Sequence, residues 1–214
     1  MVALKIEEQK AFTAGLFIGE IFDKFLVREA EIVTYNQFTI DGKVRQGYFS
    51  EEELEENRIE EYSSWKTLKP VCYSLIKGKR LPESFRIVFQ MPPSARDRFV
   101  AGKVPGIYPD QVGGLYINIQ YENHEMICVT GTSMKQFTLD RTLENEWDEN
   151  VKKFLKKNGV SLVRHPPLRA AGNGMRNLGK GVTYHEKICR ASVCPSGHGK
   201  NLRARIGGYR SVEG

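Results

Sequence analysis

The densest group of metal-ligand residue types lies between residues 185 and 198. There the sequence HEKICRASVCPSGH places two cysteines between two histidines, as His185, Cys189, Cys194 and His198. Structural zinc sites take four such ligands in a tetrahedron and usually present them in close pairs. This spacing is unlike that pattern, because four residues separate the two cysteines and no Cys-x₂-Cys pair is present. The sequence therefore favours free thiols and solvated imidazoles, with a zinc site as the alternative.

A second stretch resembles a phosphate-binding loop. GMRNLGKG, residues 174–181, fits G-x-x-x-x-G-K, but Gly181 stands where a P-loop has the Ser or Thr that binds Mg²⁺. The motif also follows a buried strand, and the preceding VRHPPLRAAGN contains Pro166 and Pro167, which a central strand excludes. We therefore predict no nucleotide cofactor.

Charge and aromatic content divide the chain near residue 160. Residues 161–214 contain ten Lys or Arg and two Glu, whereas residues 1–160 contain 22 basic and 24 acidic side chains. Of the 22 aromatic residues, only Tyr184 and Tyr209 follow residue 160. A segment so poor in large apolar groups cannot offset the entropy lost on ordering. We predict a folded domain over residues 1–160 and a basic, glycine-rich tail over residues 161–214, disordered or weakly ordered.

The N-terminal region indicates the cytoplasm, where the four cysteines stay reduced. MVALKIEEQK lacks the basic and apolar regions of a secretory signal, and no run of about 18 apolar residues is present. We therefore expect no membrane association and reduced thiols. Cys72 and Cys128 lie in apolar surroundings and are predicted to be small buried side chains.

The domain has the pattern of an α+β fold. In GGLYINIQY, large apolar side chains alternate with polar ones, which is typical of a half-buried antiparallel strand, and we expect two more strands before Asp140. RTLENEWDENVKKFLKKNG predicts a helix that ends at Gly159. Strands in sequential hairpins and a meander, packed with several helices, indicate an antiparallel sheet. The helix has one apolar stripe: Leu143, Trp147, Val151, Phe154 and Leu155.

Local signals predict several turns and caps. Asp41-Gly42 is a strong hairpin-turn signal. Ser50 and Glu53 match a capping box. Pro70 either kinks a helix that runs from Ser64 or lies in the first turn of a helix that begins near Thr67. Ser94 is predicted to cap a short helix.

Three cations, Lys77, Lys79 and Arg80, follow the predicted helix that contains Pro70. They could contact phosphate or nucleic acid, but favourable charge at the negative end of a helix dipole is the simpler interpretation. The acidic runs SEEELEE and ENEWDEN are better explained as solvated helix faces than as metal ligands. His124 is predicted in a hairpin turn, with no nucleophile near it in the sequence.

The segments FLVREAEIVTYNQFTIDGKV, YSSWKTLKPVCYSLIKGKRLP and TGTSMKQFTLDRTLENEWDENVKKFLKK together resemble an uncharacterised bacterial family, a domain of unknown function. The resemblance covers about residues 1–160 and implies no activity, since no role is assigned to that family. Its members usually end after the closing helix, so the tail lies outside the resemblance. A fused or misread C-terminus is one explanation of that difference.

Our leading hypothesis is a non-catalytic interaction module with an unknown protein partner. The sequence contains no H-E-x-x-H, G-x-S-x-G or G-x-G-x-x-G motif, although an enzyme of unrecognised type stays a third hypothesis. The alternative is weak, sequence-independent binding of nucleic acid through the tail. The candidate cations for nucleic-acid binding are Lys77, Lys79 and Arg80 in the domain, and Arg176, Lys180, Lys200, Arg203 and Arg205 in the tail.

Overall fold

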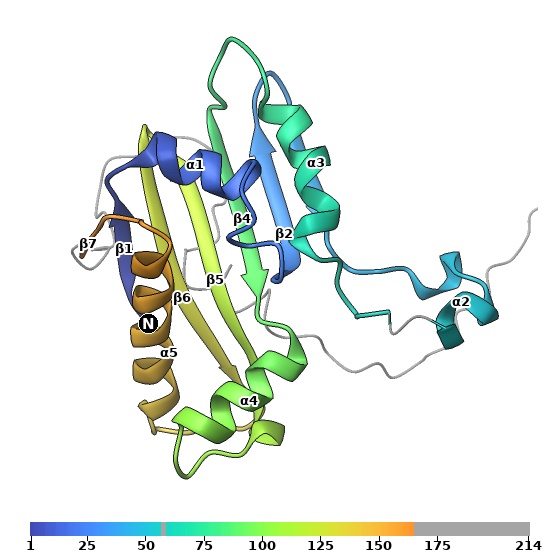
Figure 1. Cartoon of the computed structure of the whole chain (residues 1–214), viewed down its shortest axis with the longest axis vertical. Helices are drawn as coiled ribbons and strands as arrows, with labels where there is room; N and C mark the ends of the chain where they lie inside the picture. Colours follow the sequence, from blue (N-terminus) through green and yellow to red (C-terminus); the bar gives the residue numbers. More distant parts are fainter. Residues whose placement is uncertain (57–58, 165–214) are drawn as a thin grey trace, which may run out of the picture. The chain divides into compact units, whose positions relative to one another are not determined.

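The computed structural model describes residues 1–56 and 59–164, except for the side chains of residues 54–56. Within them, seven strands form one sheet in the order β3-β2-β4-β5-β6-β1-β7, and neighbouring strands pair antiparallel (Figure 1). The strands are β1 Ala3–Ile6, β2 Leu26–Val33, β3 Gln37–Asp41, β4 Ser84–Gln90, β5 Val112–Glu122, β6 Glu125–Met134 and β7 Leu162–Arg164. The predicted α+β class with an antiparallel sheet is confirmed.

The helices α1, α3 and α5 lie along the sheet (Figure 1), and the core contacts place them on one face of it. Trp65 of α3 packs edge-on against Phe89 of β4, and Trp147 of α5 donates from Nε1 to the Tyr116 carbonyl oxygen at 3.0 Å. The helices are α1 Gln9–Phe17, α2 Glu51–Glu56, α3 Trp65–Ile76, α4 Pro93–Lys103 and α5 Thr142–Lys157, with short 3₁₀ turns η1 Gln46–Tyr48 and η2 Pro109–Gln111.

The central strand β5 has one buried and one polar face. Leu115, Ile117 and Ile119 are buried beneath the helices, whereas Tyr116 and Asn118 between them are half-buried on the other face. The register places Ile119 beside Ile87 of β4 and Cys128 of β6, so apolar side chains align across three strands. Each large apolar side chain buried in this way contributes about 1.5–3 kcal/mol.

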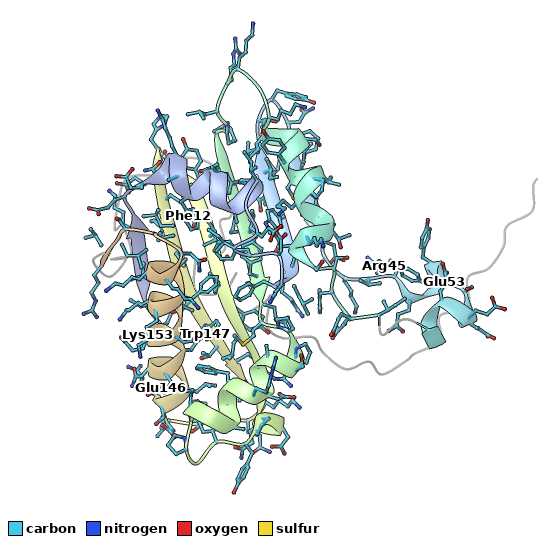
Figure 2. The ribbon with its side chains drawn as sticks, in the orientation of Figure 1. Phe12, Arg45, Glu53, Glu146, Trp147 and Lys153 are labelled. Carbon is cyan, nitrogen blue, oxygen red and sulfur yellow. The ribbon has the colours of Figure 1, made fainter. Side chains whose placement is uncertain are left out.

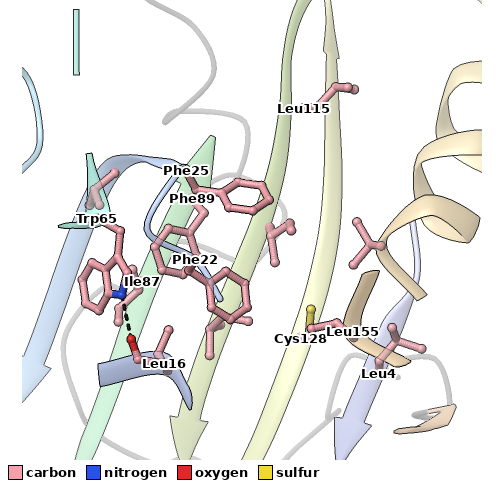
Figure 3. Packing of buried hydrophobic residues seen from close by; sticks show 14 of the residues in the cluster. Leu4, Leu16, Phe22, Phe25, Trp65, Ile87, Phe89, Leu115, Cys128 and Leu155 are labelled. Carbon is pink, nitrogen blue, oxygen red and sulfur yellow. Dashed lines mark hydrogen bonds between the residues drawn. The ribbon is translucent and has the colours of Figure 1, made fainter. Parts of the chain in front are cut away.

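Aromatic rings fill the space between the helices and β4 (Figure 3). Phe22 stacks on Phe89 with ring centroids 4.9 Å apart and meets Phe154 of α5 edge-on. The Trp65 indole, fully buried, donates from Nε1 to the Leu16 carbonyl oxygen at 2.7 Å. That hydrogen bond ties α3 to α1 and satisfies the one polar atom of the indole.

The predicted closing helix is confirmed as α5. Its apolar stripe is buried at Trp147, while Glu146 and Lys153 are exposed (Figure 2). Gly159 follows the helix with a φ of 76°, a conformation that glycine adopts without steric cost. The sheet continues just past residue 160 through β7, which pairs with β1. The domain boundary at residue 160 stays a prediction, and the tail from residue 165 lies outside the described residues.

The hairpin predicted at Asp41-Gly42 is wrong. Strands β2 and β3 turn at residues 34–36, where the Thr34 N–H donates to the Asn36 carbonyl oxygen. Gly42 instead passes so close to β2 that a Cβ atom on it would lie 1.8 Å from the Val27 carbonyl oxygen. The glycine is needed for close backbone approach rather than for a turn.

Three smaller predictions concern helix starts. The capping box is confirmed, since the Ser50 N–H donates to Glu53 Oε2 at 2.9 Å and the Glu53 N–H donates to Ser50 Oγ at 3.2 Å. Helix α3 begins at Trp65 with Pro70 inside it, so the later start near Thr67 is wrong. The cap at Ser94 is also wrong, because Pro92 precedes α4 and no side chain caps it.

No helix in residues 1–56 and 59–164 has the length and hydropathy needed to cross a membrane.

Candidate functional site

A cavity of about 280 Å³ lies between the end of β6 and the start of α5. We call it the loop pocket. Strand β6 ends beside it at Met134, and α5 begins beside it at Thr142. The connection between them supplies most of the wall. Its lining residues are Thr132, Met134, Lys135, Gln136, Phe137, Thr138, Asp140, Leu143 and Glu144.

Backbone hydrogen bonds hold a second loop beside the pocket. The Lys135 N–H donates to the Gln111 carbonyl oxygen at 2.9 Å, and the Gln111 N–H donates to the Tyr108 carbonyl oxygen at 3.0 Å. The Gln111 side chain in turn accepts from the Tyr108 N–H at 3.0 Å. The loop after α4 and the loop after β6 therefore meet at Gln111 and Lys135.

Large apolar side chains on these two loops are exposed. Phe137 is 90% exposed, Leu139 86% and Tyr108 69%. Single exposed apolar residues are common on proteins, but groups of them beside a cavity mark interaction sites. Aromatic side chains are the residues most often enriched at the centres of protein interfaces.

The charges in the loop pocket are two carboxylates and one ammonium group. Hydrogen bonds from the Thr142 hydroxyl, at 2.6 Å, and from its backbone N–H, at 2.8 Å, lower the pKa of the Asp140 carboxyl below its ordinary value. Glu144 Oε2 lies 3.4 Å from the N-terminal nitrogen of Met1. Lys135 supplies the positive charge of the lining. The lining is therefore mostly polar, and its carboxylates favour a cation over an anion.

The predicted cations Lys77, Lys79 and Arg80 lie together in the loop between α3 and β4. We call residues 77–83 the basic loop. The three side chains are exposed, and none makes an ion pair with any residue of the described part of the chain. The remaining predicted cations, Arg176, Lys180, Lys200, Arg203 and Arg205, lie outside the described residues.

The two surfaces lie at opposite ends of the sheet. Ser84, which follows the basic loop, pairs with Glu122, and Glu122 pairs with Glu125 at the start of β6. The loop pocket begins near Met134, at the far end of the same strand. At about 3.3 Å per residue, the strand separates the two surfaces by roughly 30 Å.

Both described cysteines are buried, as predicted. Burial raises the pKa of the Cys128 thiol to about 12 and that of the Cys72 thiol to about 11. At neutral pH these thiols are therefore protonated, and a protonated thiol is a poor nucleophile. His124 lies in the turn between β5 and β6 with a φ of 61°, as expected for a hairpin, and its Nδ1 is 3.3 Å from the Tyr121 hydroxyl.

The metal-ligand candidates His185, Cys189, Cys194 and His198 lie outside the described residues, as does the GMRNLGKG motif. In residues 1–56 and 59–164, no group of three or more His, Cys, Asp or Glu side chains could hold a metal ion. The acidic runs begin α2 and occupy the first half of α5.

Sequence reasoning missed Phe137 and Leu139. The sequence predicts two more strands between GGLYINIQY and Asp140, but β6 runs to Met134 and the following residues form a loop. The prediction of two strands after β5 is therefore wrong for the second. Phe137 and Leu139 are exposed in this loop rather than placed on a sheet face, and Phe137 lines the cavity.

One protein-family model matches residues 15–162, and its description is a family of unknown function (DUF5721). A search of curated proteins found no match. A search of solved structures also found none.

Proposed function

Because the chain belongs to DUF5721, a family of unknown function, its role has to be inferred from its own surface, and we propose that its domain is a non-catalytic interaction module. The loop pocket binds a segment of a partner protein. The observation that supports this proposal most strongly is the almost complete exposure of Phe137, which lines the cavity, and of Leu139 in the same loop.

The exposed trio supports a protein partner. Burying Phe137, Leu139 and Tyr108 removes large apolar areas from water, at about 25 cal/mol per Å². Rings contribute more than their area because they lose little conformational entropy on binding. The hydrogen bond between Lys135 and Gln111 holds both loops in place, so the loops lose less conformational entropy when a partner binds.

The size of the cavity limits what enters it. Drug-sized ligands occupy pockets of about 300–1,000 Å³, so 280 Å³ suits one or two side chains rather than a dinucleotide. The lining mixes Met134 and Leu143 with hydroxyl and amide groups. A Leu, Met or Phe side chain of a partner would contact Met134 and Phe137, and the polar groups of the lining would face the rest of the partner segment.

The carboxylates of the loop pocket select the charge of the partner residue that lies next to the apolar anchor. Asp140 stays ionised to low pH because Thr142 donates two hydrogen bonds to it. Glu144 is offset by the N-terminal ammonium of Met1, 3.4 Å away, so Asp140 is the lining carboxylate that makes no ion pair within the described residues. A partner segment with Lys or Arg next to its apolar anchor is therefore favoured over an acidic one.

Selection from a displayed library of random linear peptides tests the proposal. We expect the full chain to enrich peptides with a large apolar residue beside Lys or Arg. Replacing both anchors, as F137S/L139S, should weaken those peptides at least about tenfold, as loss of interface anchors does. The matched control is I18S/Y48S, which removes two similarly exposed apolar residues elsewhere.

Equal binding by F137S/L139S and by the I18S/Y48S control would refute the assignment. A library that enriches no common sequence would do the same. Both pairs of substitutions change exposed positions, so thermal unfolding should be within about 0.5 kcal/mol of the unmodified protein.

A further inference from the structure

We infer that the basic loop, with the neighbouring turn between β2 and β3, is a second binding site, and that its ligand is single-stranded nucleic acid. The phosphates contact Lys77, Lys79 and Arg80, and a base stacks on Tyr35. This site is separate from the loop pocket and does not depend on the function proposed for it.

Positive charge is concentrated in α3 and the basic loop. Residues 64–83 contain five Lys or Arg and one acid, Glu83, which is the last residue of the basic loop. Of these five, Lys69 is neutralised within the domain by Asp23, at 2.6 Å. Residues 1–160 as a whole carry a formal charge of −2, so this density of cations is a local feature. Uncompensated cations of this kind are the electrostatic signature of a phosphate-binding surface.

The helix dipole accounts for only one of the three cations. Helix α3 ends at Ile76, and the Lys77 N–H donates to the Tyr73 carbonyl oxygen at the helix end. The stabilising effect of the dipole falls off within the last turn. Lys79 and Arg80 lie past that turn, in the loop, outside the range of the dipole. Their positions are better explained by a ligand.

Aromatic side chains flank the cations. The Glu83 N–H donates to the Val33 carbonyl oxygen at 2.9 Å, which holds the basic loop against the turn that carries Tyr35. Tyr35 is 86% exposed, so its edge-on contact with Phe38 leaves most of the ring open. Tyr73, one turn before Lys77, is also exposed. Proteins that bind single-stranded nucleic acid combine cations, which contact the phosphate backbone, with exposed aromatic rings, on which the bases stack.

The geometry favours a single strand over a duplex. Readout of a duplex needs a helix or a strand pair that enters a groove, whereas the cations here lie on a loop. Stacking on Tyr35 also needs an unpaired base. Leu81 is exposed in the same loop, but one aliphatic side chain is a weak membrane anchor. A membrane surface is therefore the less favoured ligand.

Fluorescence anisotropy of labelled oligo-dT and oligo-rU with the full chain tests this site. If three phosphates are neutralised, at about 0.7 counterions each, this site alone lowers affinity about twentyfold between 50 and 200 mM salt. The variant K77Q/K79Q/R80Q should bind at least about tenfold more weakly at low salt, with a salt slope smaller by about 2. Y35A should weaken binding roughly five- to hundredfold and leave the slope unchanged.

The control is K153Q/K156Q/K157Q, which removes three exposed cations from α5 and should leave binding unchanged. Equal losses of affinity in the two triple variants would mean that general positive charge, not the basic loop, attracts the ligand. No loss in K77Q/K79Q/R80Q would mean that the cations of residues 165–214 bind the ligand. Either result would overturn the inference. Binding to vesicles of phosphatidylcholine and phosphatidylserine, without binding to either oligonucleotide, would also overturn it. A loss in K77Q/K79Q/R80Q with no effect of Y35A would reject the stacking and with it the single strand.

Discussion

Replacement of Gly42 by alanine tests how the sheet edge is built. A Cβ atom at this position would lie 1.8 Å from the Val27 carbonyl oxygen and 2.7 Å from its carbonyl carbon. Both contacts are with backbone, so no side-chain rotation relieves them. Since Cβ atoms essentially never approach within 3.0 Å of another heavy atom, the two segments must separate by at least 1.2 Å.

The separation disturbs three backbone hydrogen bonds at this edge. The Gly42 N–H donates to Arg28, the Ser63 N–H donates to Gly42, and the Val27 N–H donates to Ser63, at 3.2, 2.8 and 2.9 Å. Each such bond contributes about 1 kcal/mol net, and more where a buried partner is left unsatisfied. We therefore expect G42A to lower the free energy of unfolding by about 3–5 kcal/mol.

Urea unfolding followed by tryptophan fluorescence measures this loss. Trp65 is a suitable reporter because it is buried and lies two residues after Ser63, whose N–H donates to the Gly42 carbonyl oxygen. The control is G47A, since nothing lies within 4 Å of its added Cβ atom, and it should change stability by less than about 0.5 kcal/mol. If glycine were needed only for a left-handed turn, G42A would cost about 1–2 kcal/mol. A loss of that size or smaller would refute the close approach.

Three further predictions concern the core and the start of α5. W65F should lower the free energy of unfolding by about 2–3 kcal/mol in urea, because it removes the buried hydrogen bond to Leu16; a loss under about 0.5 kcal/mol would contradict that role. Burial raises the pKa of the Cys128 thiol from 9.0 to about 12, so its contribution is intact below pH 9 and should decline by about 1.4 kcal/mol per pH unit as pH rises toward 12; urea unfolding of C128A should lack that part of the slope. The Asp140 carboxyl has a lowered pKa, so its stabilisation is present above its ordinary pKa and is lost as pH falls through the lowered value; the difference in melting temperature between D140N and the unmodified protein should therefore vanish in strong acid, and a difference that persists there would contradict a stabilising role of the ionised carboxylate.

Local signals in the sequence were sufficient for some elements. Helix α5 could be predicted because its apolar stripe, its charges and Gly159 all lie within one segment. The capping box at Ser50 is equally local. The same is true of the half-buried strand β5, where burial follows the alternation of Leu115, Ile117 and Ile119.

Features that depend on distant contacts could not be predicted. Asp41-Gly42 has the composition of a hairpin turn, and only the approach of Val27 shows that the glycine serves another purpose. Strand β7 is three residues long and exists because β1 offers an edge to pair with. The loop pocket needs Phe137 to leave the strand pattern, which depends on the hydrogen bond between Lys135 and Gln111. The basic loop was identified in the sequence, but its contact with the turn near Tyr35 was not.

Mapping of the peptide-binding site by NMR tests the central claim most directly. A peptide selected on the unmodified protein is titrated into the labelled full chain, and backbone amide shifts are followed. We predict that the largest shifts fall on the loop pocket, from Thr132 to Glu144, and on the adjoining loop at Tyr108. Shifts confined to the basic loop or to the polar face of the sheet, with the amides around Phe137 unchanged, would contradict the proposed interaction surface.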